Sequence, residues 1–209
     1  MSLDQPAPIS LPEPGYKGIM SLEEAIARRR SIRRFTDEPL SLAQLSQLLW
    51  ATQGITGASS GDRAIPSAGA TYPLEIFIVC GRSGIEGVAA GIYHYHVTRH
   101  SLSRQHGGDV RPVLSRAALG AESIYEAPAS IVISAEYERT LMRYGDRGER
   151  YVHMEVGHAG QNIYLQAAAL GLATVAVGAF DDEQVREVLR LDRHLQPLYI
   201  MPVGKPVWS

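Results

Sequence analysis

The chain has 209 residues with 45% hydrophobic and 20% charged side chains, a composition that fits one soluble globular domain with a substantial core. Its formal net charge of −2 gives no overall basic field, which argues against general nucleic-acid binding. The single cysteine, Cys80, excludes an intrachain disulfide or a multi-cysteine metal centre, and the lack of a signal peptide or membrane-length apolar run predicts a cytoplasmic protein.

The N-terminal part is predicted to be an extended arm over residues 1–20, followed by one domain over residues 21–209. Prolines at positions 6, 8, 12 and 14 leave the arm without helix or strand-ladder potential. Ser21 and Glu24 have the spacing of a capping box and open a short helix that runs into a cluster of arginines. Ser41 and Gln44 open a second helix with leucines on one face, and a Gly/Ser loop follows at 54–64.

The rest of the chain mixes strands and helices without a regular order. Apolar runs predict strands at 74–80, 92–97, 129–137, 173–179 and 197–204, and helical patterns predict helices at 109–118, 149–170 and 181–191. Two neighbouring strands close enough to be antiparallel favour an α+β sheet covered by helices over a regular βαβ fold. No G-x-G-x-x-G follows a strand, and the Gly/Ser loop lacks a P-loop ending, so neither nucleotide motif is supported.

Five arginines lie in the segment ARRRSIRRF, residues 27–35: Arg28, Arg29, Arg30, Arg33 and Arg34. Cations at the end of a helix complement its dipole by roughly 0.3–1 kcal/mol each, which accounts for one or two of them. In an extended SIRRF, Ser31 and Arg33 face the same side, and a hydroxyl with guanidinium groups forms a phosphate site. The residues leave two interpretations open, an anion site and a solvated basic helix end.

Histidines gather at positions 94, 96 and 100. Residues two apart on a strand share a face, but no carboxylate or cysteine stands nearby in the sequence, so we predict no metal site. Tyr93 and Tyr95 indicate that this strand is half-exposed.

Four segments in this order resemble the nitroreductase family of flavoproteins: RRRSIRRFTDEPLSLAQLSQLL, IPSAGATYPLE, EVGHAGQNIYLQAAALGLATVAVGAFDD and LYIMPVGKP. The likeness runs from about Ser21 to Pro206 and is strongest to the SagB-type dehydrogenase branch. It implies an α+β nitroreductase-like sandwich, with a mostly antiparallel central sheet covered by helices, in an intertwined homodimer with flavin sites at the subunit interface. We interpret Glu155, Asn162 and Gln166 as a polar stripe on a long dimer-interface helix.

The resemblance also implies bound flavin mononucleotide (FMN) and the residues around it. The family's Arg-x-Ser-x-Arg/Lys segment assigns to the flavin phosphate Arg29, Arg30, Ser31 and Arg33. The loop that lines the isoalloxazine or ribityl chain, from the partner subunit, carries over to Pro66, Ser67, Ala68 and Gly69. The turn whose backbone N–H groups face the redox-active edge carries over to Val177, Gly178 and Ala179. Lys205 is a further candidate for the phosphate, while Arg28 and Arg34 stay on the surface.

The function implied is an FMN-dependent oxidoreductase that transfers hydride from NADH or NADPH through the flavin to a small electron-poor acceptor, such as a nitroaromatic or a quinone. The alternatives are a SagB-type dehydrogenase that oxidises azoline rings in modified peptides, and a flavin-binding protein without NAD(P)H turnover. Azoline-oxidising relatives have a Lys-Tyr pair where this chain has Arg143 and Tyr144, our candidate catalytic residues. Because arginine is a poor base, this difference argues against azoline oxidation.

Overall fold

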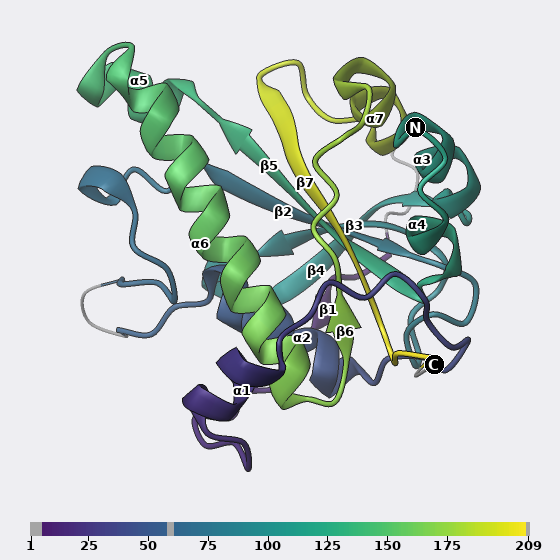
Figure 1. Ribbon diagram of the computed structural model, residues 1–209. Coiled ribbons are helices and arrows are strands. Elements are labelled where there is room, and N and C mark those ends of the chain that lie inside the picture. Colours follow the sequence, from purple (N-terminus) through teal and green to yellow (C-terminus); the bar gives the residue numbers. More distant parts are fainter. Residues whose placement is uncertain (1–5, 58–60, 208–209) are drawn as a thin grey trace.

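The computed structural model describes residues 6–57 and 61–207, and in this part of the chain seven strands form one sheet in the order β1-β4-β3-β2-β5-β7-β6 (Figure 1). All neighbouring strands are antiparallel. The strands are β1 (Ile9–Ser10), β2 (Leu74–Cys80), β3 (Gly91–His96), β4 (Ser101–Gly107), β5 (Ala129–Glu136), β6 (Ala173–Thr174) and β7 (Leu195–Gly204). The predicted mostly antiparallel α+β sheet is confirmed.

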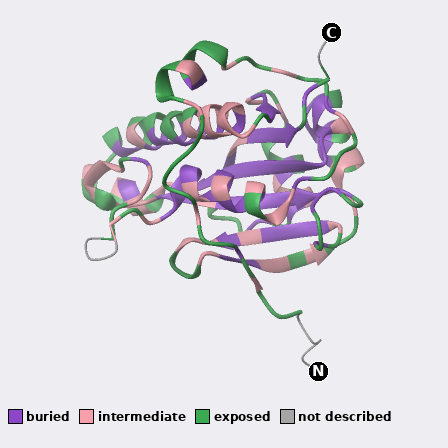
Figure 2. Cartoon of the chain, turned by 90° about the horizontal axis from the view of Figure 1, so that it is seen from below, coloured by how far each residue is buried: buried purple, intermediate pink, exposed green. Residues whose placement is uncertain are grey.

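Helices cover both faces of this sheet. They are α1 (Leu22–Arg28), α2 (Leu42–Gln53), α3 (Arg111–Ala117), α4 (Glu122–Glu126), α5 (Glu138–Tyr144), α6 (Arg147–Ala169) and α7 (Asp182–Leu189), with 3₁₀ turns η1 (Ala68–Ala70) and η2 (Val97–Arg99). On one face, α2 and α6 bury leucines and valines against Ile76 and Ile133 of the central strands. On the other face, α3, α4 and α7 pack on Val79, Val132 and Ile200. The central strands β2 and β5 between these layers are almost wholly buried (Figure 2).

The helix starts follow the capping residues that the sequence predicts. The Ser21 hydroxyl accepts from the Glu24 N–H at 3.1 Å, and Ser41 forms a complete capping box with Gln44. The 23-residue helix α6 runs from Arg147, two positions before the predicted start. It is followed by Gly171 in a left-handed conformation, φ +69°, as predicted for its C-terminal glycine.

The prediction that the proline-rich arm forms no ladder is wrong in its middle. Ile9 and Ser10 pair with β4 at the sheet edge, and the Leu11 N–H donates to the His100 carbonyl at 3.0 Å. An edge strand needs only alternate backbone groups, and residues 9–11 lie between prolines with their own N–H groups intact. Residues 1–5 of the arm lie outside the described residues.

Three elements escaped sequence prediction: β4, α4 and α5. The β4 sequence SLSRQHG is polar because the strand lies near the sheet edge with half-exposed side chains. Conversely, the predicted strand 173–179 pairs only over Ala173–Thr174, with one further bridge between Val177 and Ile200; the rest is an open turn. Of the predicted Gly/Ser loop 54–64, residues 58–60 lie outside the described residues.

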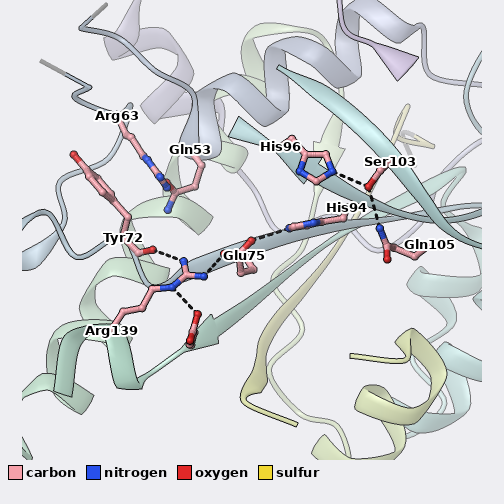
Figure 3. A network of polar contacts seen from close by, with 10 residues as sticks. Gln53, Arg63, Tyr72, Glu75, His94, His96, Ser103, Gln105 and Arg139 are labelled. Atoms are coloured by element: carbon pink, nitrogen blue, oxygen red, sulfur yellow. Dashed lines mark hydrogen bonds and ion pairs between the residues drawn. The ribbon is translucent and has the colours of Figure 1, made fainter. Parts of the chain in front are cut away.

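Two expectations about β3 are also corrected. Tyr93 and Tyr95 are buried, not half-exposed, because β2 and β4 flank the strand. His94 does meet a carboxylate, since its Nε2 lies 2.7 Å from Glu75 Oε2 on the adjacent strand (Figure 3). Sequence distance hid this neighbour. In the described residues, no group of three metal-binding side chains converges.

The polar stripe on α6 faces inward. The Asn162 amide donates to the carbonyls of Ala51 and Ala64, and Gln166 accepts from Gln47 on α2 at 3.2 Å. Glu155 is only 2% exposed. Burial of Glu155 in its own subunit contradicts an interface position for that side chain. Asn162 and Gln166 are half-buried and link α6 to α2 and to Ala64, and their position at a dimer interface stays a prediction. Among the described residues, no helix is long and apolar enough to cross a membrane.

Candidate functional site

The arginine cluster spans the end of α1 and the strand-like segment that follows. Arg28 forms an ion pair with Glu24 one turn earlier at 2.5 Å. Arg30 Nη1 donates back to the carbonyls of Ala27 and Arg29 at 2.9 and 2.7 Å. Both side chains thus serve the exposed end of a helix, where cations satisfy carbonyls and the dipole. The helix-end interpretation of the cluster accounts for these two.

The next residues form no strand, but two isolated bridges tie them to the sheet edge. Ser31 bridges Thr174 in parallel, and the Ile32 N–H donates to the Thr174 carbonyl at 3.0 Å. Further on, Phe35 pairs with Pro206 after the end of β7.

Tyr164 of α6 organises the start of this segment. Its hydroxyl lies 2.9 Å from Ser31 Oγ and accepts from the Ala176 N–H at 2.8 Å. Its ring lies 5.2 Å from the Arg29 guanidinium carbon, a cation–π distance. Sequence reasoning missed Tyr164, which stands in the quoted α6 motif but whose contacts come from residues 12 to 135 positions away. Arg29, Ser31 and Tyr164 form one polar group beside a cavity of about 140 Å³.

Arg33 lies at a second cavity, of about 470 Å³, together with Arg34 and the turn 175–179. Arg34 contacts Glu126 at 3.3 Å and is 73% exposed at its side chain, as the surface interpretation requires. In the described part of the chain, the guanidinium groups of Arg29 and Arg33 form no hydrogen bond or ion pair with a protein acceptor. Two guanidinium groups without a protein partner and a hydroxyl, all within one five-residue segment, are the donor types that a phosphate dianion requires, so this donor set fits FMN.

The turn 177–179 presents backbone N–H groups at the same cavity. Val177 uses its N–H and carbonyl in the bridge to Ile200. Gly178 and Ala179 are exposed, and their N–H groups have no partner among the described residues. A Cβ on Gly178 would lie 3.4 Å from the Tyr199 ring, so a small residue suits this position. The structure thus brings Arg33 and this turn together.

The 66–69 loop lies elsewhere, against α5 and α6. Arg143 Nη1 donates to the Gly69 carbonyl at 3.0 Å, and a Cβ on Gly69 would meet the Tyr144 hydroxyl at 2.6 Å. The Ser67 hydroxyl points inward, donating to Glu155 at 2.6 Å, while Pro66 is exposed. The predicted loop residues and the candidate catalytic pair are therefore neighbours.

Lys205 completes the set of predicted contacts. Its ammonium group pairs with both carboxylate oxygens of Glu38 at 2.9 and 2.8 Å, on the surface. Its role at a phosphate stays a prediction.

A third cavity, of about 580 Å³, lies between α5, α6, α7 and β7 and has no predicted site residue in its lining. The Tyr137 hydroxyl there lies 2.6 Å from His153 Nε2, and burial raises the pKa of Tyr137 to about 12.

A model of the nitroreductase family matches residues 26–205, a range that includes all of the predicted site residues. The chain belongs to the nitroreductase family. Its fold and the order of its motifs agree with that membership, and the nitroreductase-like sandwich expected from the sequence is confirmed. Members are oxidoreductases, so this assigns the chain to an enzyme class.

This nitroreductase-family chain is similar to individual proteins over most of its length. It is 47% identical over 188 residues to "Putative nitroreductase MJ1384" of Methanocaldococcus jannaschii, covering 90% of the chain and 92% of the relative. The crystal structure of a protein from Ralstonia eutropha JMP134, also described as a putative nitroreductase, superposes with a TM-score of 0.83 at 27% identity. The superposition covers 97% of this chain and 90% of that protein's chain. The microcin B17-processing protein McbC of Escherichia coli is 27% identical over 200 residues, 91% of this chain and 74% of McbC, which supports the SagB-type branch.

Proposed function

We propose that the protein is an FMN-dependent oxidoreductase that passes hydride from NADH or NADPH to a small electron-poor acceptor such as a nitroaromatic or a quinone. One observation carries the proposal: Arg29 and Arg33 flank Ser31 and lack protein carboxylate partners. Clustered cations without counter-charges favour a bound anion. Because the chain belongs to the nitroreductase family, the anion that we propose is the flavin phosphate.

In this proposal, each residue group has a separate task. Arg29 and Ser31 hold the phosphate, with Tyr164 fixing their positions through its hydroxyl and ring. Arg33 contributes to the phosphate site from the larger cavity, where the N–H groups of Gly178 and Ala179 face the ring system. The bound flavin supplies the hydride chemistry. Fixed N–H donors favour negative charge that develops on the ring, so the protein contributes orientation and electrostatics.

A homodimer is part of the proposal. The outer side of α6 exposes Met154 to 51%, and a Cβ on Gly157 would meet nothing within 4 Å. A long central helix with an apolar and a small residue on its open side suits close packing against a second copy. The 66–69 loop of one subunit would then contact the flavin of its partner.

The alternative, oxidation of azoline rings in a modified peptide, draws on the likeness to McbC, a microcin-processing protein. Against it stands Arg143, whose guanidinium donates to the Gly69 carbonyl and thus holds a loop. Arginine keeps its proton at any physiological pH, so it cannot serve as the base that ring oxidation requires. Azoline turnover that appears in an Arg143→Lys variant would favour this alternative.

The first test is an anaerobic absorbance spectrum of the purified protein between about 300 and 550 nm, before and after NADH or NADPH. Two flavin bands that bleach on addition of either nucleotide support the proposed oxidoreductase. Bands that persist favour the peptide dehydrogenase or a flavin-binding protein without turnover. No bands after reconstitution with FMN would overturn the cofactor assignment.

A further inference from the structure

The 66–72 loop has an unusual backbone. Three of its residues have positive φ: Gly69 at +60°, Ala70 at +54° and Tyr72 at +46°. Only glycine adopts this region without steric cost, so Ala70 and Tyr72 are held there by their surroundings. Residues in such conformations concentrate at functional sites, where neighbouring contacts determine the backbone.

Tyr72 is held on three sides, and Figure 3 shows the two contacts that come from Arg139 and Arg63. Its carbonyl accepts from Arg139 Nη1 at 3.0 Å, and its ring lies 4.1 Å from the Arg63 guanidinium carbon. Its N–H donates to Ser67 Oγ at 2.9 Å. Arg139 is itself fixed, since it pairs with Glu75 at 2.6 Å. The carbonyl and ring contacts therefore come from charged groups, whereas the N–H depends on one serine hydroxyl.

The Ser67 hydroxyl is oriented by Glu155. A hydroxyl has one proton, and Ser67 donates it to Glu155 Oε2 at 2.6 Å. Its oxygen is then free to accept from Tyr72. Glu155 comes from the middle of α6 and is 2% exposed. Its second oxygen, Oε1, is buried without a well-formed hydrogen bond, although the Gln53 side chain of α2 also interacts with this carboxylate. A carboxyl group in this position is costly to bury, and core packing alone would be served better by an apolar side chain.

We propose that Glu155 is a positioning residue that orients the Ser67 hydroxyl, and that this hydroxyl keeps Tyr72 and the whole 66–72 loop in the conformation that contacts the flavin. The first part of this proposal, the orientation of the Ser67 hydroxyl, is supported by a relay of two hydrogen bonds, from the Tyr72 N–H to Ser67 and from the Ser67 hydroxyl to Glu155. The step from loop to flavin rests on the proposed function. The charge of Arg63, three residues before the loop, acts on Glu155 and favours its ionised form.

Hydrogen exchange of the Tyr72 amide, followed by NMR on the protein without added flavin, tests the relay. Glu155→Leu should accelerate exchange roughly tenfold, the loss expected for one buried hydrogen bond. Glu155→Gln retains an acceptor oxygen and should stay near wild type. Glu149→Gln, an exposed position on the same helix, is the matched control. Unchanged exchange in Glu155→Leu overturns the proposal. If that variant fails to fold, Ser67→Ala breaks the same relay from the loop side and decides in its place.

The affinity for added FMN, measured by fluorescence quenching, tests the second part. We expect Glu155→Leu to weaken binding roughly tenfold and Glu155→Gln to restore it. Faster Tyr72 exchange with unchanged FMN affinity overturns the positioning of the loop toward flavin. If the wild-type protein itself binds no FMN, the proposed function fails, and with it the flavin step. The Tyr72 exchange would still decide the relay, so the two failures are distinguishable.

Discussion

Glu155 carries a charge in a place that disfavours it. Burial raises its pKa above the ordinary carboxyl value, and the hydrogen bond from Ser67, the charge of Arg63 and the Gln53 side chain offset this only in part. The folded protein therefore binds this proton more tightly than the unfolded chain does. The free energy of unfolding must then fall as pH rises from the ordinary carboxyl pKa through the raised one, and the penalty is complete above it.

We expect Glu155→Gln to remove this penalty. The variant should unfold at higher urea concentration than wild type at neutral pH, and the two curves should converge in acid, below the ordinary carboxyl pKa. Urea titrations at a series of pH values measure this. Glu149→Gln, with the same change of charge on an exposed position of α6, should follow the wild-type profile. A Glu155→Gln profile parallel to wild type would contradict the assignment of the raised pKa.

Gly69 is required both for its positive φ and for the close approach of α5. Gly171 has only the positive φ, so a comparison of the two glycines distinguishes the two effects. Gly69 and Gly171 both have positive φ, +60° and +69°. A Cβ on Gly171 would meet nothing within 4 Å, whereas one on Gly69 would meet Tyr144 and Arg143 at 2.6 and 2.7 Å. Gly171→Ala should cost about 1 kcal/mol from the backbone alone, and Gly69→Ala roughly 2 kcal/mol, because the Arg143 contact is also displaced. Equal losses of unfolding free energy in denaturant titrations of the two variants would show that α5 moves to accommodate the added Cβ without a further cost.

At the scale of elements, the segment from the end of α1 to residue 35 contains two kinds of arginine, those with a carboxylate partner and those without one. Arg28 and Arg34 have carboxylate partners, and Arg29 and Arg33 have none in the described residues. The Arg29→Ala/Arg33→Ala double variant should lose FMN, since each charged hydrogen bond contributes roughly 1.5–3 kcal/mol. Arg28→Ala/Arg34→Ala removes the same charge and should keep most of its affinity. Equilibrium dialysis compares the two, and an equal loss in both would reduce the effect to general electrostatics.

An element can be predicted from the sequence when the residues that determine it lie close together in the chain. The capping residues Ser21 and Ser41 act within one turn, and α6 has a pattern long enough to define its ends, so these predictions are confirmed. The local density of arginines predicts a phosphate segment, and its binding of a phosphate stays a prediction. Tyr164 and Glu155 were missed in their roles, because their partners Ser31 and Ser67 lie 133 and 88 positions away. An inward-facing carboxylate and an interface carboxylate look alike in a helical pattern.

At the scale of the whole molecule, α6 connects the two parts of the proposed site. Tyr164 supports the phosphate segment and Glu155 supports the 66–72 loop. These positions are nine residues apart, about 13 Å along the helix axis. The open side of the same helix, around Met154 and Gly157, is the face proposed for the second subunit. One helix would thus set the position of the cofactor, the loop and the partner.

A shared site predicts complementation between two defective subunits. The Arg29→Ala/Arg33→Ala variant keeps an intact loop, and the Gly69→Ala variant keeps an intact phosphate segment. If each flavin takes its phosphate contacts from one subunit and its loop from the other, then each mixed dimer regains one complete site. Refolding the two variants together in equal amounts should therefore restore about one FMN site in four, because half of the dimers are mixed. The same variants refolded separately and then combined in the cold are the control. FMN binding that stays at the level of that control would place both parts of the site in one subunit.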